Sequence, residues 1–365
     1  MQKGSELKKK LTSWIYSMQM KNPWEFKYAP NCPPTMWASA FAALSLAFLG
    51  EFENFSKETR TKWIKYLQSF QKEETGFFID PVFNSKDRLS KNHTDELLFA
   101  HSSTFVMGAL NRLGAKPLYP IRWTHKYHNP HEMEKWLASL DWHINAWVVG
   151  NWSYDIGCAL GMDYLVTGKQ GPLDGINAYF DWYDRNQNPQ TGWWDIANNS
   201  PIMCQQYGGY HTLMVYWMFD RPVPKADKMI DTSLALQHQD GLFYPEGGGG
   251  CCQDMDCIDP LVNLGWATGY RTNDITKALG KSIEPMLGKY NPDGGVCDNP
   301  KFTRAEFGWQ LCKAEPGQSD MCSAFFYPFT LILAAEFTKN SQLLDTNWSH
   351  LETYCHCVKR KVYLK

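Results

Sequence analysis

The chain has 365 residues, of which 44% are hydrophobic and 20% are charged, so it can bury a large core as one large domain or two small ones. Its formal net charge of −2 argues against a nucleic-acid partner, because binding to phosphates needs clustered Lys and Arg. The sequence also contains 16 Trp, 18 Tyr and 20 Phe, which either fill the core or line a concave binding site.

The N-terminal segment, residues 1–14, is polar and lacks the apolar stretch of a secretory signal peptide. No apolar run reaches the ~18 residues that a membrane span needs. The cysteines number 11, which is odd, and their irregular spacings predict free thiols. These features predict a cytoplasmic protein, for which peripheral contact with a membrane stays open.

Apolar side chains recur every three or four residues in segments 37–48, 105–113 and 325–333, which predicts helices with one apolar face. Strand patterns are scarce. A short strand or hairpin could form at residues 77–79 or 242–244. The pattern as a whole predicts an all-α fold.

A turn pattern recurs between the predicted helices. It starts with Gln or Asn, continues through polar residues to Gly and usually ends on aromatic residues. It occurs at residues 71–78, 187–194, 237–243 and 291–296. The later copies lie about 50 residues apart and the first gap is about twice as long, so we expect a degenerate copy near residues 136–151.

Repeats of this length stack as helix pairs, each of which buries its apolar face against the next pair. The chain is long enough for about six pairs, and it has no distinctly polar capping repeats, which favours a closed ring over an open solenoid. We therefore predict one domain over residues 1–365. Its fold is an (α/α)6-type toroid of repeated helix pairs, with the Gly-rich turns at one end of the ring.

These repeats resemble the terpenoid cyclase and protein prenyltransferase superfamily, in particular the repeats of squalene–hopene cyclases. The turn motif of that superfamily has Gln, three residues, Gly, one residue and an aromatic. Residues 237–243 fit it directly, and residues 187–194 fit with one extra residue. Residues 240–261 are similar to the Gly-rich loop and acidic motif of class II cyclases, although they read DxDxxD in place of DxDD. The resemblance implies a toroid and an enzyme that handles isoprenoids.

Zinc is not predicted by the resemblance or by the cysteines. Residues 316–320 resemble the segment before the zinc His of protein prenyltransferases, but no His follows nearby. The Cys251-Cys252 pair with Cys257 lacks the spacing of a zinc ribbon, and Cys355-His356-Cys357 has no second half.

The first candidate site is the acidic segment that follows Glu246 and four glycines. Asp254, Asp256 and Asp259 lie within six residues, and carboxyls packed in a partly dry cavity have raised pKa values, so at least one should hold a proton. A protonated Asp256 could donate to an alkene or epoxide while the other two set its pKa. The same trio could bind Mg²⁺ through oxygen atoms, or simply cap a helix that begins near Asp259 and Pro260. In a functional site, the loop from Glu246 to Asp259 should line the central cavity with its carboxylates facing inward.

The second candidate is Tyr210 with His211, which could form an acid–base pair or belong to the core of an inner helix. His101 and residues 141–155 fit either a site or the ends of helices. Aromatic side chains would shield cationic intermediates by cation–π contact. The predicted substrate-binding residues are Trp193, Trp194, Phe243, Tyr244 and Glu246.

Three functions stay open. The first is an isoprenoid-handling enzyme that resembles terpene cyclases and acts on a small prenyl substrate. The second is a carbohydrate-active toroid, either a polysaccharide lyase or a glycosidase, in which His211, Tyr210 and the Asp carboxylates do acid–base work. The third is a binding scaffold without catalysis. A deep apolar cavity with one acidic spot favours the first, and a groove edged with Trp, Asn, His and carboxylates favours the second. A ring plugged by side chains favours the third.

Overall fold

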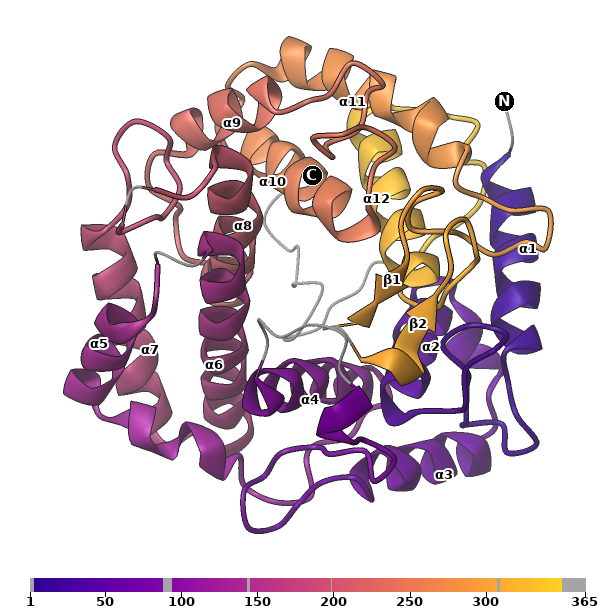
Figure 1. Cartoon of the computed structure of the whole chain (residues 1–365), viewed down its shortest axis with the longest axis horizontal. Helices are drawn as coiled ribbons and strands as arrows, with labels where there is room; N and C mark the ends of the chain where they lie inside the picture. The colour runs from indigo at the N-terminus through magenta and orange to yellow at the C-terminus, as the bar shows by residue number, and fades with distance from the viewer. Residues whose placement is uncertain (1–2, 88–93, 143–144, 198, 307–308, 350–365) are drawn as a thin grey trace.

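The computed structural model describes residues 3–87, 94–142, 145–197, 199–306 and 309–349. Within these ranges, twelve α-helices form a ring around a central region (Figure 1). The inner helices are α2 (Met36–Phe48), α4 (Asp95–Arg112), α6 (Ala146–Thr167), α8 (Ile202–Met218), α10 (Cys251–Thr268) and α12 (Ser323–Thr338). The outer helices are α1 (Gly4–Ser17), α3 (Lys57–Gln68), α5 (Pro130–Ser139), α7 (Gln170–Arg185), α9 (Ala226–Ala235) and α11 (Thr272–Leu287).

The inner helices close the ring. Each contacts the next inner helix, from α2 through α4, α6, α8 and α10 to α12, and α12 contacts α2. Every residue of α2 is buried, and the other inner helices are buried over most of their length. None of the helices in the described part of the chain is long and apolar enough to cross a membrane. The predicted all-α toroid of six helix pairs is therefore confirmed, whereas its extent as one domain over residues 1–365 stays a prediction.

The outer helices are amphipathic and cover the inner layer. In α11, the buried apolar residues Ile275, Leu279, Ile283 and Met286 recur every three or four positions. That spacing places them on one face of the helix, which packs against α12 and α10. The two layers are thus held together by apolar burial.

The Gln of the repeated turn explains why the pattern recurs. Gln187 Nε2 donates to the carbonyl of Gly192 in its own turn and to that of Pro224 before α9, both at 2.7 Å. The same pair of bonds is made by Gln71, to Gly76 and Tyr119, and by Gln237, to Gly241 and Ala278. Each Gln therefore closes its turn and ties it to the next helix pair.

The predicted start of α10 is wrong. The helix begins at Cys251 rather than near Asp259, and Pro260 lies inside it. Proline has no N–H to donate to the carbonyl one turn earlier, that of Asp256. Gln206 Nε2 of α8 donates to that carbonyl instead, at 2.9 Å. A bond between helices thus replaces the missing one within α10, so the proline does not end the helix.

A two-stranded sheet lies in the long connection before α12. Strand β1 (Arg304–Ala305) pairs antiparallel with β2 (Lys313–Ala314). The strand expected at residues 77–79 is reduced to a single bridge between Gln71 and Phe78. Residues 242–244 form no strand. Short 3-10 helices complete the described elements: η1 (Glu51–Asn54), η2 (Ser85–Asp87), η3 (Arg122–His128) and η5 (Gln310–Cys312).

Helices α6 and α8 touch backbone to backbone. A Cβ added at Gly208 would lie 2.2 Å from the Ala146 carbonyl oxygen, and one added at Gly150 would lie 2.3 Å from Gly208 Cα. No side chain can be accommodated at such distances unless the helices separate. The two glycines therefore set the spacing of two inner helices.

Gly208→Ala is expected to lower the free energy of unfolding by about 3 kcal/mol, because it forces a rigid contact apart. Gly280→Ala is the matched control, since Gly280 is exposed in the middle of α11 and an added Cβ there meets nothing within 4 Å. It should raise the free energy of unfolding by about 0.5–1 kcal/mol, because Ala favours the helix. Chemical denaturation of both variants measures the difference. Equal effects would contradict the close approach of α6 and α8.

Candidate functional site

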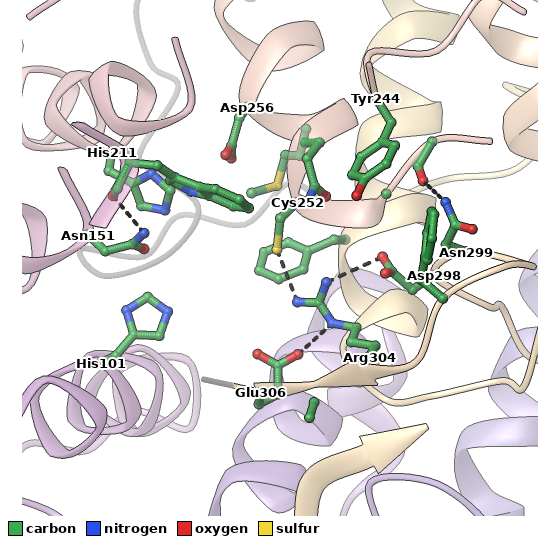
Figure 2. Close-up of a pocket in the computed structure, with 18 of the residues that line it drawn as sticks. His101, Asn151, His211, Tyr244, Cys252, Asp256, Asp298, Asn299, Arg304 and Glu306 are labelled. Atoms are coloured by element: carbon green, nitrogen blue, oxygen red, sulfur yellow. Dashed lines mark hydrogen bonds and ion pairs between the residues drawn. The ribbon is translucent and has the colours of Figure 1, made fainter. Parts of the chain in front are cut away.

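A cavity of about 610 Å³ opens among the inner helices. Its walls come from α4, α6, α8 and α10 and from the connection that carries β1. Figure 2 shows His101, His211 and Asn151 on one side and Arg304 with its acidic partners on the other. The side chains of the repeat and of the long connection therefore meet across one space.

Asp256 of α10 presents its carboxyl group to this cavity (Figure 2). Both carboxyl oxygens are buried and have no hydrogen-bond partner in the protein. Burial raises the pKa of Asp256 well above its usual value, and the nearby charges of Cys252 and Asp259 raise it further. The protonated form of Asp256 is therefore favoured, so this carboxyl can act as an acid toward a bound molecule.

Asp254 is buried but turned to the protein. It accepts from the backbone amides of Phe243 at 2.7 Å and Gly250 at 3.2 Å and from the Tyr327 hydroxyl at 2.9 Å. Burial raises its pKa to about 6, and these bonds oppose the rise. A Cβ added at the left-handed Gly249 would lie 2.5 Å from the Asp254 carboxylate, so only glycine lets the loop fold onto it. Asp254 thus anchors the Gly-rich loop.

Asp259 faces α8, where its carboxylate accepts from the Tyr210 hydroxyl at 2.9 Å, and it also accepts from Asn263. Neither Asp254 nor Asp259 lines the cavity. The expectation that all the loop carboxylates face the cavity is therefore wrong for these two. The reason is the earlier helix start: α10 turns by 100° at each residue, so three acids close in sequence point in different directions.

Three-ligand clusters of His, Cys, Asp or Glu occur elsewhere in the described residues, at Cys251, Cys252 and Cys322 and at His125, His128 and Asp163. The three aspartates form no such cluster, because their carboxylates do not converge. The structure therefore gives no support to a Mg²⁺ site at Asp254, Asp256 and Asp259.

Two histidines line the cavity with defined tautomers. His211 Nδ1 lies 2.7 Å from the Tyr207 carbonyl, so Nδ1 carries the hydrogen and Nε2 the lone pair. Burial lowers the pKa of His211 to about 4, which keeps it neutral at pH 7. His101 Nδ1 lies 3.1 Å from the Asp155 carboxylate, and Asp155 also accepts from Thr104. An Asp–His pair of this kind orients the ring.

Arg304 of β1 forms the opposite wall. Its Nε donates to Glu306 at 2.7 Å and its Nη1 to Asp298 at 3.3 Å. Its Nη2 donates to the sulfur atoms of Cys252 and Cys322, both at 3.2 Å. The guanidinium thus donates to two carboxylates and two sulfur atoms, and the carboxylates compensate its positive charge.

The thiols of Cys251, Cys252 and Cys322 lie within 4.8 Å of one another. Hydrogen bonds from the other two thiols, together with the charge of Arg304, hold the pKa of Cys252 well below its usual range although burial opposes them. The guanidinium stabilises the negative form of the Cys252 sulfur, whereas burial raises the pKa of Cys251 and Cys322 well above the usual value. Cys257, which the sequence grouped with Cys251 and Cys252, is not part of the cluster. The segment Cys355-His356-Cys357 lies outside the described residues.

The structure brings together some of the predicted site residues and not others. Asp256, His211 and Tyr244 line the cavity. Glu246 is exposed on the loop and does not line it. Four predicted residues are buried in the packing between helices: Tyr210, Trp193, Trp194 and Phe243. Trp194 donates to the Tyr183 carbonyl at 2.8 Å, which fixes it in the core. These aromatic side chains therefore support the fold and do not shield a ligand.

Sequence reasoning missed most of the far wall. It gave no reason to single out Arg304, Glu306 or Asp298, since they lie in an irregular connection without a repeat signal. His101 fitted a helix end as well as a site, and the segment that contains Asn151 fitted a turn of the repeat better than a site. Both residues lie more than one turn inside their helices, α4 and α6, and a cap residue would lie at the helix end. That position is the signal that could have identified them as site residues.

Residues 1–101 match the family model described as the prenyltransferase alpha-alpha toroid domain. The resemblance to that superfamily is therefore confirmed for this part of the chain. Of the residues that line the cavity, the match includes His101. The acidic segment that carried the most specific part of the resemblance lies beyond it. No curated protein matches the chain in sequence.

Solved structures with the same fold include two from carbohydrate enzymes. A polysaccharide lyase is 13% identical and superposes with a TM-score of 0.51, over 94% of this chain and 99% of that chain. A glycosyl hydrolase family 88 protein from Bacteroides vulgatus is 12% identical, with a TM-score of 0.50 over 92% of this chain and 100% of that chain. At these identities the likeness shows the fold alone, an (α/α) toroid.

The neutral, buried state of His211 makes stability depend on pH. The unfolded chain takes up a proton near pH 6.5, whereas folded His211 does so only near pH 4. The unfolding free energy of the wild type relative to His211→Gln should therefore fall by about 3 kcal/mol as the pH drops from 7 to 4. Urea denaturation across that range measures it.

The matched control is His131→Gln, because His131 is exposed on α5. Its unfolding free energy should follow the wild type in parallel over the same range. A difference between wild type and His211→Gln that stays constant from pH 7 to pH 4 would contradict a neutral buried His211.

Proposed function

We propose that the protein hydrolyses a glycosidic bond in an uncharged saccharide. The observation that carries the proposal is the unpartnered carboxyl of Asp256, whose pKa is raised by burial and which faces a cavity edged with hydrogen-bonding groups. Glycosidic cleavage needs an acid that gives its proton to the leaving oxygen. A carboxyl group with a raised pKa supplies that acid at neutral pH.

The cavity lining suits a sugar. Asn145, which caps the N-terminus of α6, and Asn151 within α6 bring amide groups to the cavity that can bind hydroxyls, and Trp147 offers a flat face on which a pyranose ring can stack. Apolar cavities with a single acidic spot suit isoprenoids instead. The aromatic side chains that would have shielded a carbocation, Trp193 and Trp194, lie in the core.

The charges of the lining favour an uncharged substrate. Among the described lining residues, Arg304 is the one with a permanent positive charge, and it is paired with Glu306 and Asp298. A prenyl diphosphate or a uronate would bring negative charge to a site whose cation is already neutralised. Elimination from a uronate also needs its carboxylate to be neutralised, which this lining does not offer. Hydrolysis needs no such cation.

The roles follow from the two sides of the cavity. Asp256 gives its proton to the glycosidic oxygen as the bond between that oxygen and the anomeric carbon breaks. A water molecule attacks the same carbon, and His101 accepts the proton that the water releases, with Asp155 stabilising the imidazolium. The proton on His101 returns through solvent to Asp256, which restores both groups. His211 and Asn151 hold the sugar from the same wall.

The fold comparisons support a carbohydrate enzyme as the class. The polysaccharide lyase and the glycosyl hydrolase family 88 protein share the toroid with this chain. The match to the prenyltransferase toroid domain is no stronger support for an isoprenoid enzyme than these two structures are for a carbohydrate enzyme. It ends at residue 101 and includes little of the cavity wall. The proposal therefore rests on the lining of the cavity.

Incubation of the purified protein with neutral oligosaccharides, uronate-containing oligosaccharides and prenyl diphosphates tests the proposal. We expect new reducing ends from a neutral oligosaccharide, without the ultraviolet absorbance of an unsaturated uronate. An unsaturated product would show a lyase, and a cyclised or transferred prenyl chain would show an isoprenoid enzyme. Either of these results would overturn the proposed hydrolysis.

In the assay that this panel establishes, Asp256→Asn should lower kcat by about 10²–10⁴-fold, because Asn has nearly the same shape but no acidic proton. Activity in the wild type should fall as the pH rises through the raised pKa of Asp256, since the acid is then lost. Asp227→Asn, on the exposed first turn of α9, is the matched control and should leave kcat unchanged. Full activity of Asp256→Asn would refute the role of Asp256 as the acid.

A further inference from the structure

We propose that His125, His128 and Asp163 form a binding site for a first-row transition-metal ion such as Zn²⁺, separate from the cavity. Their ligand atoms all lie within 4.8 Å of one another. Two imidazoles and one carboxylate are a donor set that zinc accepts, with the fourth position left to water. The proposed hydrolysis does not use any of the three residues.

The local structure places the ligands together. His125 and His128 are three residues apart on the 3-10 helix η3, where side chains at that spacing lie on one face, and their ring centroids are 5.0 Å apart. Asp163 reaches them from the second half of α6. It lies about 18 Å along that helix from Asn151 of the cavity wall, at 1.5 Å per residue. The site is thus distinct from the cavity.

One separation matches a shared metal ion. His128 Nε2 lies 3.2 Å from Asp163 Oδ2. Two ligands of a tetrahedral zinc ion, each bonded at about 2.0–2.1 Å, lie about 3.3 Å apart. The two atoms therefore already have the spacing that zinc requires, without a movement of either side chain.

The same two atoms are close but lack the alignment of a good hydrogen bond. His128 Nε2 is buried and has no hydrogen-bond partner, although the carboxylate oxygen is within reach. A buried polar atom in this state is destabilising unless something else satisfies it. A cation bonded to both the nitrogen and the oxygen would satisfy the two atoms together.

His125 is exposed, so its side chain can turn toward the other two ligands and leaves one side of the ion open to water.

A metal ion here would join η3 to α6. The connection between α4 and α5 contains η3, and it packs on α7, where a Cβ at Gly175 would lie 2.1 Å from the Tyr127 carbonyl. A bond from this connection to α6 adds a link between an outer segment and the inner layer. Zn²⁺ should therefore stabilise the folded chain.

The test is Zn²⁺ binding to the full chain after treatment with a chelator, measured by calorimetry in the wild type and in His125→Ala and His128→Ala. His125 is exposed, so His125→Ala removes a ligand with little effect on packing. Loss of outer-shell partners already weakens metal sites by about 10–100-fold, so loss of a ligand should weaken this site by at least about 100-fold. Zn²⁺ at about 100 times its Kd should also raise the Tm of the wild type by a few degrees, and not that of the variants.

His238→Ala is the matched control. His238 Nδ1 lies 3.1 Å from Asp240 Oδ1, but this pair belongs to no three-ligand cluster among the described residues. The His238→Ala variant should bind Zn²⁺ with the same affinity as the wild type. Co²⁺ in place of Zn²⁺ separates the site from the thiols of Cys251 and Cys252, because thiolate ligands give intense charge-transfer absorption and imidazole and carboxylate do not. Unchanged affinity in both ligand variants, or a Co²⁺ spectrum of thiolate ligation alone, would overturn the proposal.

Discussion

Burial of the inner helices on every side governs the rest of the structure. A polar group in such a helix cannot reach bulk water, so it must find a partner inside the protein or carry the free-energy penalty of desolvation. Asp155 is paired with His101, and Asp259 accepts from Tyr210. Asp256 differs because its carboxyl opens on the cavity without a protein partner. The constraint that pairs the other two carboxyls thus leaves the Asp256 carboxyl unpaired and turned to the cavity.

The ring could be predicted from the sequence because its signals are local. The apolar periodicity of the helices and the Gln-to-Gly turns each lie within a few residues, and Gln187 shows that the pattern has a structural cause. The start of α10 could not be predicted in the same way. A proline often marks the first turn of a helix. Pro260 instead lies inside α10, where Gln206 of another helix donates to the Asp256 carbonyl that the proline leaves without a donor. Local rules fail where a distant side chain supplies the compensation.

The candidate site was predicted in part for a related reason. Asp256 and His211 were identified by their residue type and their neighbours in the sequence, and both line the cavity. Trp193 and Trp194 were wrongly predicted to bind a substrate and lie in the core. The sequence could not distinguish the two cases, because an aromatic residue has the same sequence pattern in the core and in a binding site. Arg304 reaches the cavity through the closing of the ring and through a short sheet. Neither follows from its neighbours in the chain.

The connections between helices differ greatly in what they do. Helices α6 and α10 pass to the outer layer through short turns at Gly168 and Gly269, which have left-handed backbone angles. The connection from α11 to α12 is long and carries Arg304 and Glu306 into the cavity. Insertions or deletions in that connection would reshape the cavity without shifting the register of the inner helices. Evolution can therefore change what such a ring accepts while its scaffold stays constant, and homologous chains should diverge most in that one segment.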